Sequence, residues 1–152
     1  MARTAADKAR HRKFAVDCFN GTWKLMEKKR RSKEEDERMV HMAHASRYHW
    51  SVAGTPGNRA VGDWQLSRVY LILKRSDSAM HYAKMCLETC RRAGLRDFFL
   101  AYAYEALARA CVLAGQRRDA RRFLVLARKA GTDIEDAEDR KLLARDLATI
   151  RA

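Results

Sequence analysis

The chain has 152 residues, of which 47% are hydrophobic and 34% are charged, a balance typical of a soluble globular protein. Its length suits one domain, residues 1–152, and is sufficient to bury a core. A single proline and seven glycines argue against a sandwich or barrel built from many short strands. The 32 Lys and Arg residues exceed the 19 Asp and Glu residues and give a net charge of +13.

No apolar run approaches the roughly 20 residues that a membrane-crossing helix needs. The N-terminal sequence MARTAADKARHRKFAV is basic and lacks the apolar stretch of a secretory signal. We therefore expect a cytoplasmic protein without a membrane span. In a reducing compartment the four cysteines, all within helical patterns, are expected to be small buried hydrophobic residues rather than disulfides.

Apolar residues recur at helical spacing along most of the chain and predict about seven helices and no strand. The first is the basic helix within residues 1–33, from about 5 to 30, and the second runs from the acids at 34–37 to about 53. After the turn sequence GTPGN, a third covers about 59–74. A fourth, capped within the SDS at 76–78, ends near Gly94, and a fifth covers 97–114. The sixth covers 117–131, and the last, capped by Thr132 or Asp133, forms a C-terminal cap within 132–152.

The chain partly matches itself after a shift of 41 residues between 59 and 131. Leu66 aligns with Leu107, Arg68 with Arg109, and several small residues align with small residues. Each unit consists of a helix, a tight turn and a second helix. The sequence therefore predicts an all-α fold of antiparallel helical hairpins, with two repeats in this region.

The second unit resembles a tetratricopeptide repeat. Eight residues fall at the places of that motif: Tyr104, Leu107, Ala108, Cys111, Gly115, Ala120, Leu124 and Ala127. Two of them, Cys111 and Leu124, replace aromatic residues, the closing proline is missing, and the 41-residue period exceeds the usual 34. The first unit matches less well and lacks the turn glycine. The segments AHASRYHW, WQLSRVY and AYEALARA also resemble a family of small uncharacterised bacterial proteins, a likeness that implies no chemistry.

In a tetratricopeptide-like stack, the first helix of each unit lines a concave groove. The resemblance therefore implies that the groove is lined by Trp64, Arg68, Tyr102, Glu105 and Arg109. Arg68 and Arg109 would stand one above the other, and guanidinium groups flanked by aromatic rings suit an acidic peptide or a small anion. Alternatively, Glu105 and Arg109 form only a local surface pair, worth about 0.3–0.5 kcal/mol.

The stretch HMAHASRYHW, residues 41–50, places His44, Arg47 and Tyr48 on one stripe of a helix. Together with His81 these residues could line a pocket, or they could simply make hydrogen bonds between helices. No Asp or Glu lies between Val40 and Gly62 to complete a metal site with the histidines. No nucleophile, phosphate-loop or dinucleotide motif is present, so we assign no catalytic residue, metal or cofactor.

The leading hypothesis is a non-catalytic binding module whose groove takes a protein or peptide partner or a small anion. A first alternative is nucleic-acid binding through residues 1–33, with a local excess of +8, and through the basic run from Arg117 to Arg122. A second alternative is an enzyme or sensor, which predicts an enclosed pocket joining His44, Arg47, Arg68 and Glu105. A second copy of the chain could also cover an end of the stack to form a homodimer.

Overall fold

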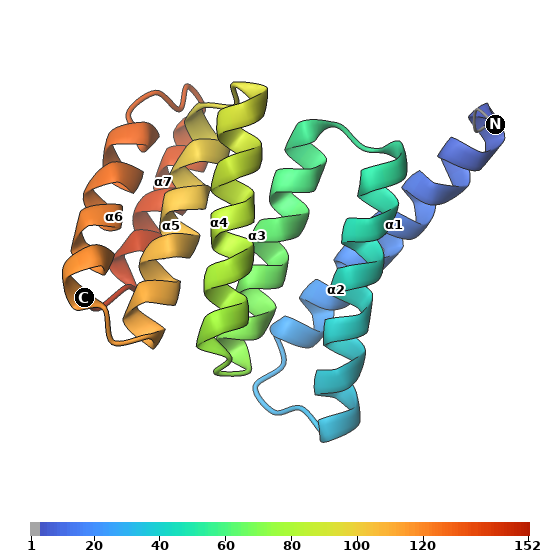
Figure 1. Ribbon diagram of the computed structural model, residues 1–152, viewed down its shortest axis with the longest axis horizontal. Helices are drawn as coiled ribbons and strands as arrows, with labels where there is room; N and C mark the ends of the chain where they lie inside the picture. Colours follow the sequence, from blue (N-terminus) through green and yellow to red (C-terminus); the bar gives the residue numbers. More distant parts are fainter. Residues whose placement is uncertain (1–3) are drawn as a thin grey trace.

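The computed structural model describes residues 4–152, and within this range every regular element is a helix (Figure 1). The all-α prediction is confirmed, and so is the number of helices in the described range. They are α1 (Ala5–Met26), α2 (Lys33–Ala53), α3 (Pro56–Ile72), α4 (Ser76–Ala93), α5 (Asp97–Leu113), α6 (Arg117–Gly131) and α7 (Ala137–Ala148). None of these described helices has the length and apolar character needed to cross a bilayer.

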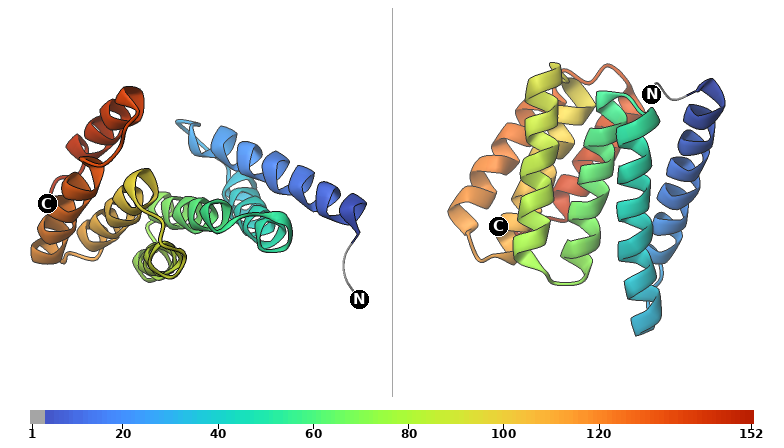
Figure 2. Two further views of the ribbon diagram at one scale, coloured as in Figure 1. Left: turned by 90° about the horizontal axis from the view of Figure 1, so that it is seen from above. Right: turned by 45° about the vertical axis from the view of Figure 1, so that its right-hand side comes forward.

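Neighbouring helices pack as antiparallel pairs, α1 with α2, α3 with α4, and α5 with α6, while α7 packs against α5 and α6. Viewed from above, α1 and α7 rise on the same side of a floor formed by α3 and α5 (Figure 2). Helices α4 and α6 lie on the other side of that floor. The stack is therefore curved, and its concave side lies between α1 and α7.

The structure corrects three of the expected helix starts, and at two of them a capping side chain explains the observed position. The third helix begins at Pro56 rather than 59, because Thr55 accepts a hydrogen bond from the Asn58 amide and proline suits the first helical position. Helix α4 starts at Ser76 itself, with no side-chain cap from the SDS sequence. The last helix is capped by Asp136 rather than Thr132 or Asp133.

The end of the first helix also differs from the expected position near residue 30. Helix α1 ends at Met26, and the Arg31 Nη1 atom donates to the carbonyls of Leu25 and Lys28 at 3.3 and 3.0 Å. These bonds satisfy carbonyl groups at the end of the helix and stabilise the turn into α2.

The 41-residue repeat is visible in the boundaries of the helices. The first residues of α3 and α5, Pro56 and Asp97, are 41 positions apart, and so are the first residues of α4 and α6. The turns that join each pair contain equivalent residues with left-handed backbone, Lys74 at φ 59° and Gly115 at φ 75°. The first unit therefore makes the same turn without its glycine.

Small buried residues lie at the contacts between the paired helices. The Ser67 hydroxyl, on α3, donates to the carbonyl of Ala79 on α4 at 2.8 Å, and both residues are buried. Cys86, Cys90 and Cys111 are buried with free thiols, as expected, whereas Cys18 is half-buried and free. A larger side chain at these contacts would separate the helices.

Candidate functional site

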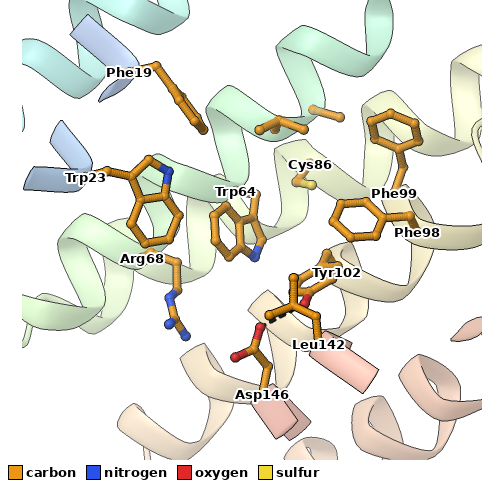
Figure 3. Close-up of a pocket in the computed structure, with 12 residues that line it drawn as sticks. Phe19, Trp23, Trp64, Arg68, Cys86, Phe98, Phe99, Tyr102, Leu142 and Asp146 are labelled. Atoms are coloured by element: carbon orange, nitrogen blue, oxygen red, sulfur yellow. Dashed lines mark hydrogen bonds between the residues drawn. The ribbon is translucent and has the colours of Figure 1, made fainter. Parts of the chain in front are cut away.

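A hollow of about 370 Å³ lies on the concave side of the stack (Figure 3). Its lining comes from α1, α3, α4, α5 and α7, so helices from both ends of the stack contribute to it. The lining residues are Phe19, Trp23, Ala60, Val61, Trp64, Arg68, Cys86, Phe98, Phe99, Tyr102, Leu142 and Asp146. We refer to this site as the concave hollow.

Five aromatic rings follow one another across the concave hollow. The centroid of the Trp23 ring lies 6.4 Å from that of Phe19 and 5.7 Å from that of Trp64. Tyr102 then contacts Trp64 edge-on at 5.7 Å and Phe98 at 4.6 Å. Such distances are typical of attractive aromatic pairs. Four of the five rings are only half-buried, so apolar surface remains open to the hollow.

The floor of the hollow is tied together by Glu105, whose exposed fraction is 0%. Its Oε2 accepts a hydrogen bond from Trp64 Nε1 at 2.9 Å. Its Oε1 accepts from Arg68 Nη1 at 3.3 Å and from Arg109 Nε. A buried carboxylate needs such charged donors, because an unpaired charge away from water is strongly unfavourable. Both predicted groove arginines therefore share one buried partner.

Arg109 has a structural role as well, because it holds the end of α7. Its Nη2 donates to the Asp146 carbonyl and to the Thr149 hydroxyl, each at 2.9 Å. Cations favour the carbonyl end of a helix, and these bonds satisfy part of that end. The guanidinium of Arg109 is thus used within the fold, and it is Arg68 that lines the hollow.

Polar groups of both signs stand at the edge of the hollow. The Tyr102 hydroxyl donates to Asp146 Oδ2 at 2.8 Å, and burial together with this carboxylate raises the pKa of Tyr102. Burial lowers the pKa of Arg68, while the charge of Glu105 opposes that effect. Figure 3 shows the Arg68 guanidinium and the Asp146 carboxylate on the same side of the aromatic series. A ligand would meet one positive and one negative group there.

The structure brings together all five residues assigned to the groove by the resemblance. Trp64, Arg68 and Tyr102 line the hollow, while Glu105 and Arg109 lie beneath them in the hydrogen-bond network. Sequence reasoning missed the other nine lining residues, although the helical spacing that includes Phe19 and Trp23 was a signal for a common face. Among the nine are three rings of the aromatic series and one carboxylate: Phe19, Trp23, Phe98 and Asp146.

The His/Arg/Tyr stripe of α2 lies at a different contact, where α2 meets α3 and α4. His44 Nε2 lies 2.8 Å from the Tyr70 hydroxyl, and the His44 ring packs edge-on against Tyr82. Burial, followed by the nearby His41, lowers the pKa of His44. Arg47 forms a two-point ion pair with Asp63 at 2.7 and 3.3 Å. Burial raises the pKa of the fully buried Asp63, and Arg47 opposes that rise.

The other two residues of that prediction make no hydrogen bond with this ion pair, although His81 is near enough for its charge to act on Asp63. Tyr48 is 55% exposed and contacts the ring of His49, and His81 packs edge-on against Tyr82 at 4.9 Å. His44 and Arg47 therefore bind α2 to α3, whereas Arg68 and Glu105 belong to the contact between α3 and α5. Among residues 4–152, no three His, Cys, Asp or Glu side chains converge as metal ligands would.

No protein family model, curated protein or solved structure matches this chain. The resemblance to tetratricopeptide repeats stays a prediction.

Proposed function

We propose that this chain is a binding module whose concave hollow receives a bulky apolar side chain from a peptide segment of a partner protein. The observation that carries the proposal is the series of five aromatic rings, drawn from α1, α3 and α5, that line one hollow. The repeat spacing supports the view that the hairpins follow a tetratricopeptide-like plan with binding on the concave side.

The open aromatic surface is favourable for binding because it is removed from water when an apolar group covers it. A volume of about 370 Å³ is comparable to small-ligand sites, which measure roughly 300–1,000 Å³. Full burial of a Leu, Ile or Phe side chain contributes about 1.5–3 kcal/mol. A single anchor side chain of this kind would supply roughly a fifth to a third of the binding free energy of a micromolar complex, about 8 kcal/mol.

Arg68 and Asp146 supply the polar contacts that would orient the peptide beside this anchor. Arg68 donates to Glu105 through Nη1, so its other N–H groups remain as donors for a peptide carbonyl or an acidic side chain. Because Glu105 also pairs with Arg109, a ligand carboxylate would meet one guanidinium rather than two. We therefore expect a peptide with a bulky apolar residue and a nearby acidic residue.

The proposal can be tested with a substitution that fills the hollow and leaves its hydrogen-bond network unchanged. Val61 lines the hollow, whereas Val125 is 61% exposed on α6. Peptides selected from a random displayed library against the full chain should bind Val61→Trp at least about tenfold more weakly, a loss of about 1.4 kcal/mol. The same peptides should bind Val125→Trp as they bind the wild type. Selected peptides whose affinity is equal for all three proteins would refute the proposal.

A further inference from the structure

The outer surface of α6 carries six cations: Arg117, Arg118, Arg121, Arg122, Arg128 and Lys129. All six are exposed, and we call this surface the α6 basic face. The opposite side of the helix packs into the core, where Ala120, Leu124 and Ala127 are buried. Asp119 is the single acidic residue of the helix.

The α6 basic face differs from the basic N-terminal region in how its charges are used. Of the nine ion pairs among the described residues, four involve cations of the first 33 residues: Arg10, Lys13, Lys28 and Arg31. None of the nine involves a cation of α6. The charges of α6 are therefore available to an external anion, whereas part of the N-terminal charge is neutralised locally.

Local helix stability does not explain the arginines at the start of α6. Arg117 and Arg118 lie in the first turn, where the helix dipole disfavours cations, and no side chain caps this end. Arg121 and Arg122 follow them four positions later, a spacing at which like charges repel. These positions weaken the helix, which suggests that they serve an intermolecular contact.

A groove beside α6 extends the positive surface onto a second helix. Its volume is about 380 Å³, and it lies between α4 and α6 on the convex side. Lys84 and Arg91 of α4 line this groove together with Arg122, and Asp119 is its only acidic lining residue. Leu107 and Cys111 contribute to the lining from α5. Cations thus face one groove from both of its walls.

We propose that the α6 basic face, together with Lys84 and Arg91, binds the phosphate backbone of a nucleic acid. Five of the six cations of the face are arginines, whose planar donors match phosphate oxygens in pairs. At 1.5 Å per residue, Arg117 and Arg128 are separated by about 16 Å along the helix. That length spans about five phosphates of one strand at 3.4 Å per charge.

The composition of α6 favours a nucleic acid over an anionic membrane. A helix that lies on a bilayer inserts Trp, Phe or Leu side chains into it, next to a basic face. The apolar residues of α6 are instead packed into the core, and Val125 is the large hydrophobic residue that the helix exposes. The α6 basic face therefore offers charge without a membrane-inserting surface.

The experiment compares two variants with the same change in net charge. The first is Arg117→Glu, Arg118→Glu, Arg121→Glu and Arg122→Glu together. The control is Lys8→Glu, Lys24→Glu, Lys29→Glu and Arg30→Glu, all exposed cations outside the ion pairs of the described residues. Fluorescence anisotropy with a short labelled DNA duplex measures affinity over a series of salt concentrations.

We expect the affinity of the wild type to fall roughly 100-fold between about 50 and 200 mM salt, as neutralisation of four phosphates implies. The α6 variant should bind at least about tenfold more weakly than the control variant. Its affinity should also depend less on salt, with a slope smaller by about 0.9 for each phosphate that it no longer neutralises. Equal weakening in both variants, or wild-type binding to phosphatidylserine vesicles without binding to the duplex, would overturn the proposal.

The α6 variant should stay folded, because all four substituted side chains are exposed and acids at positions 117 and 118 are favourable in the first turn of the helix. Arg121→Gln with Arg122→Gln provides a milder variant that introduces no negative charge. Its salt slope should be smaller than that of the wild type by about 2. An unchanged slope in this milder variant would also overturn the proposal.

Discussion

Trp64 donates its indole N–H to the carboxylate of Glu105 over 2.9 Å, and the two residues occupy the same position in successive 41-residue units. The repeat-equivalent pair Arg68 and Arg109 also converges on this carboxylate. One buried acid therefore joins the two units and positions the side chains that line the concave hollow.

Replacing Glu105 with Gln should destabilise the protein by about 3 kcal/mol, because two half-buried guanidinium groups lose their anionic partner. Glu88→Gln is the matched control, since Glu88 forms an exposed pair with Arg92 that contributes less than about 1 kcal/mol. Urea unfolding measures both changes. Similar destabilisation of the two variants would show that Glu105 does not hold the two repeat units together.

The left-handed turn residue Lys74 predicts a stabilising substitution. Lys74→Gly should raise the free energy of unfolding by about 1 kcal/mol, because glycine adopts positive φ without the steric cost of a Cβ atom. At the equivalent position, Gly115→Ala should lower it by a similar amount, although no atom lies within 4 Å of the added Cβ. Thermal unfolding of the two variants should shift in opposite directions; shifts of the same sign would contradict this account of the turns.

Stability should fall as the pH drops from about 7 toward 5. Burial lowers the pKa values of His44 and His49 below their ordinary 6.5, so the unfolded chain binds protons more readily than the folded chain. Their contribution to stability is complete above about pH 6.5 and is lost as the pH falls below it. Urea midpoints of the wild type and of His44→Phe with His49→Phe measure the effect. A wild type whose midpoint falls no more steeply than that of the variant would contradict it.

Arg109→Lys should loosen α7 selectively. Lysine can keep the charge opposite Glu105, but it lacks the forked donors that also reach the Asp146 carbonyl and the Thr149 hydroxyl. Hydrogen exchange should therefore accelerate in α7 by about fivefold or more, the equivalent of about 1 kcal/mol, while α3 and α4 stay protected. Uniform acceleration throughout the chain would mean that Arg109 acts on global stability instead.

The fold was predictable because the helical spacing of apolar residues and the 41-residue repeat can both be read directly from the sequence. Helix ends were predictable where a turn residue such as Gly115 follows the helix. Helix starts were missed where two nearby residues offer similar caps, as in α7, which is capped by Asp136 rather than by Thr132 or Asp133. Capping preference alone does not choose between such neighbours, and in the structure the segment before Asp136 contributes Ile134 to the core.

The floor of the hollow was also accessible from the sequence, because Trp64, Arg68, Tyr102, Glu105 and Arg109 follow the repeat. The walls of the hollow could not be predicted, because α1 and α7 lie outside the two repeat units and their orientation depends on the curvature of the stack. The bonds of Arg109 to α7 could not be inferred from spacing either, because they join residues 37 and 40 positions apart.

The most direct test of binding in the concave hollow uses the three tryptophan side chains as reporters. Trp23 and Trp64 line the hollow, whereas Trp50 is buried on α2, with the Arg12 guanidinium over its ring. In a nitrogen–proton NMR titration with a library-selected peptide, the indole resonances of Trp23 and Trp64 should shift and that of Trp50 should stay in place. Shifts confined to Trp50, or none at the other two, would contradict the proposed site.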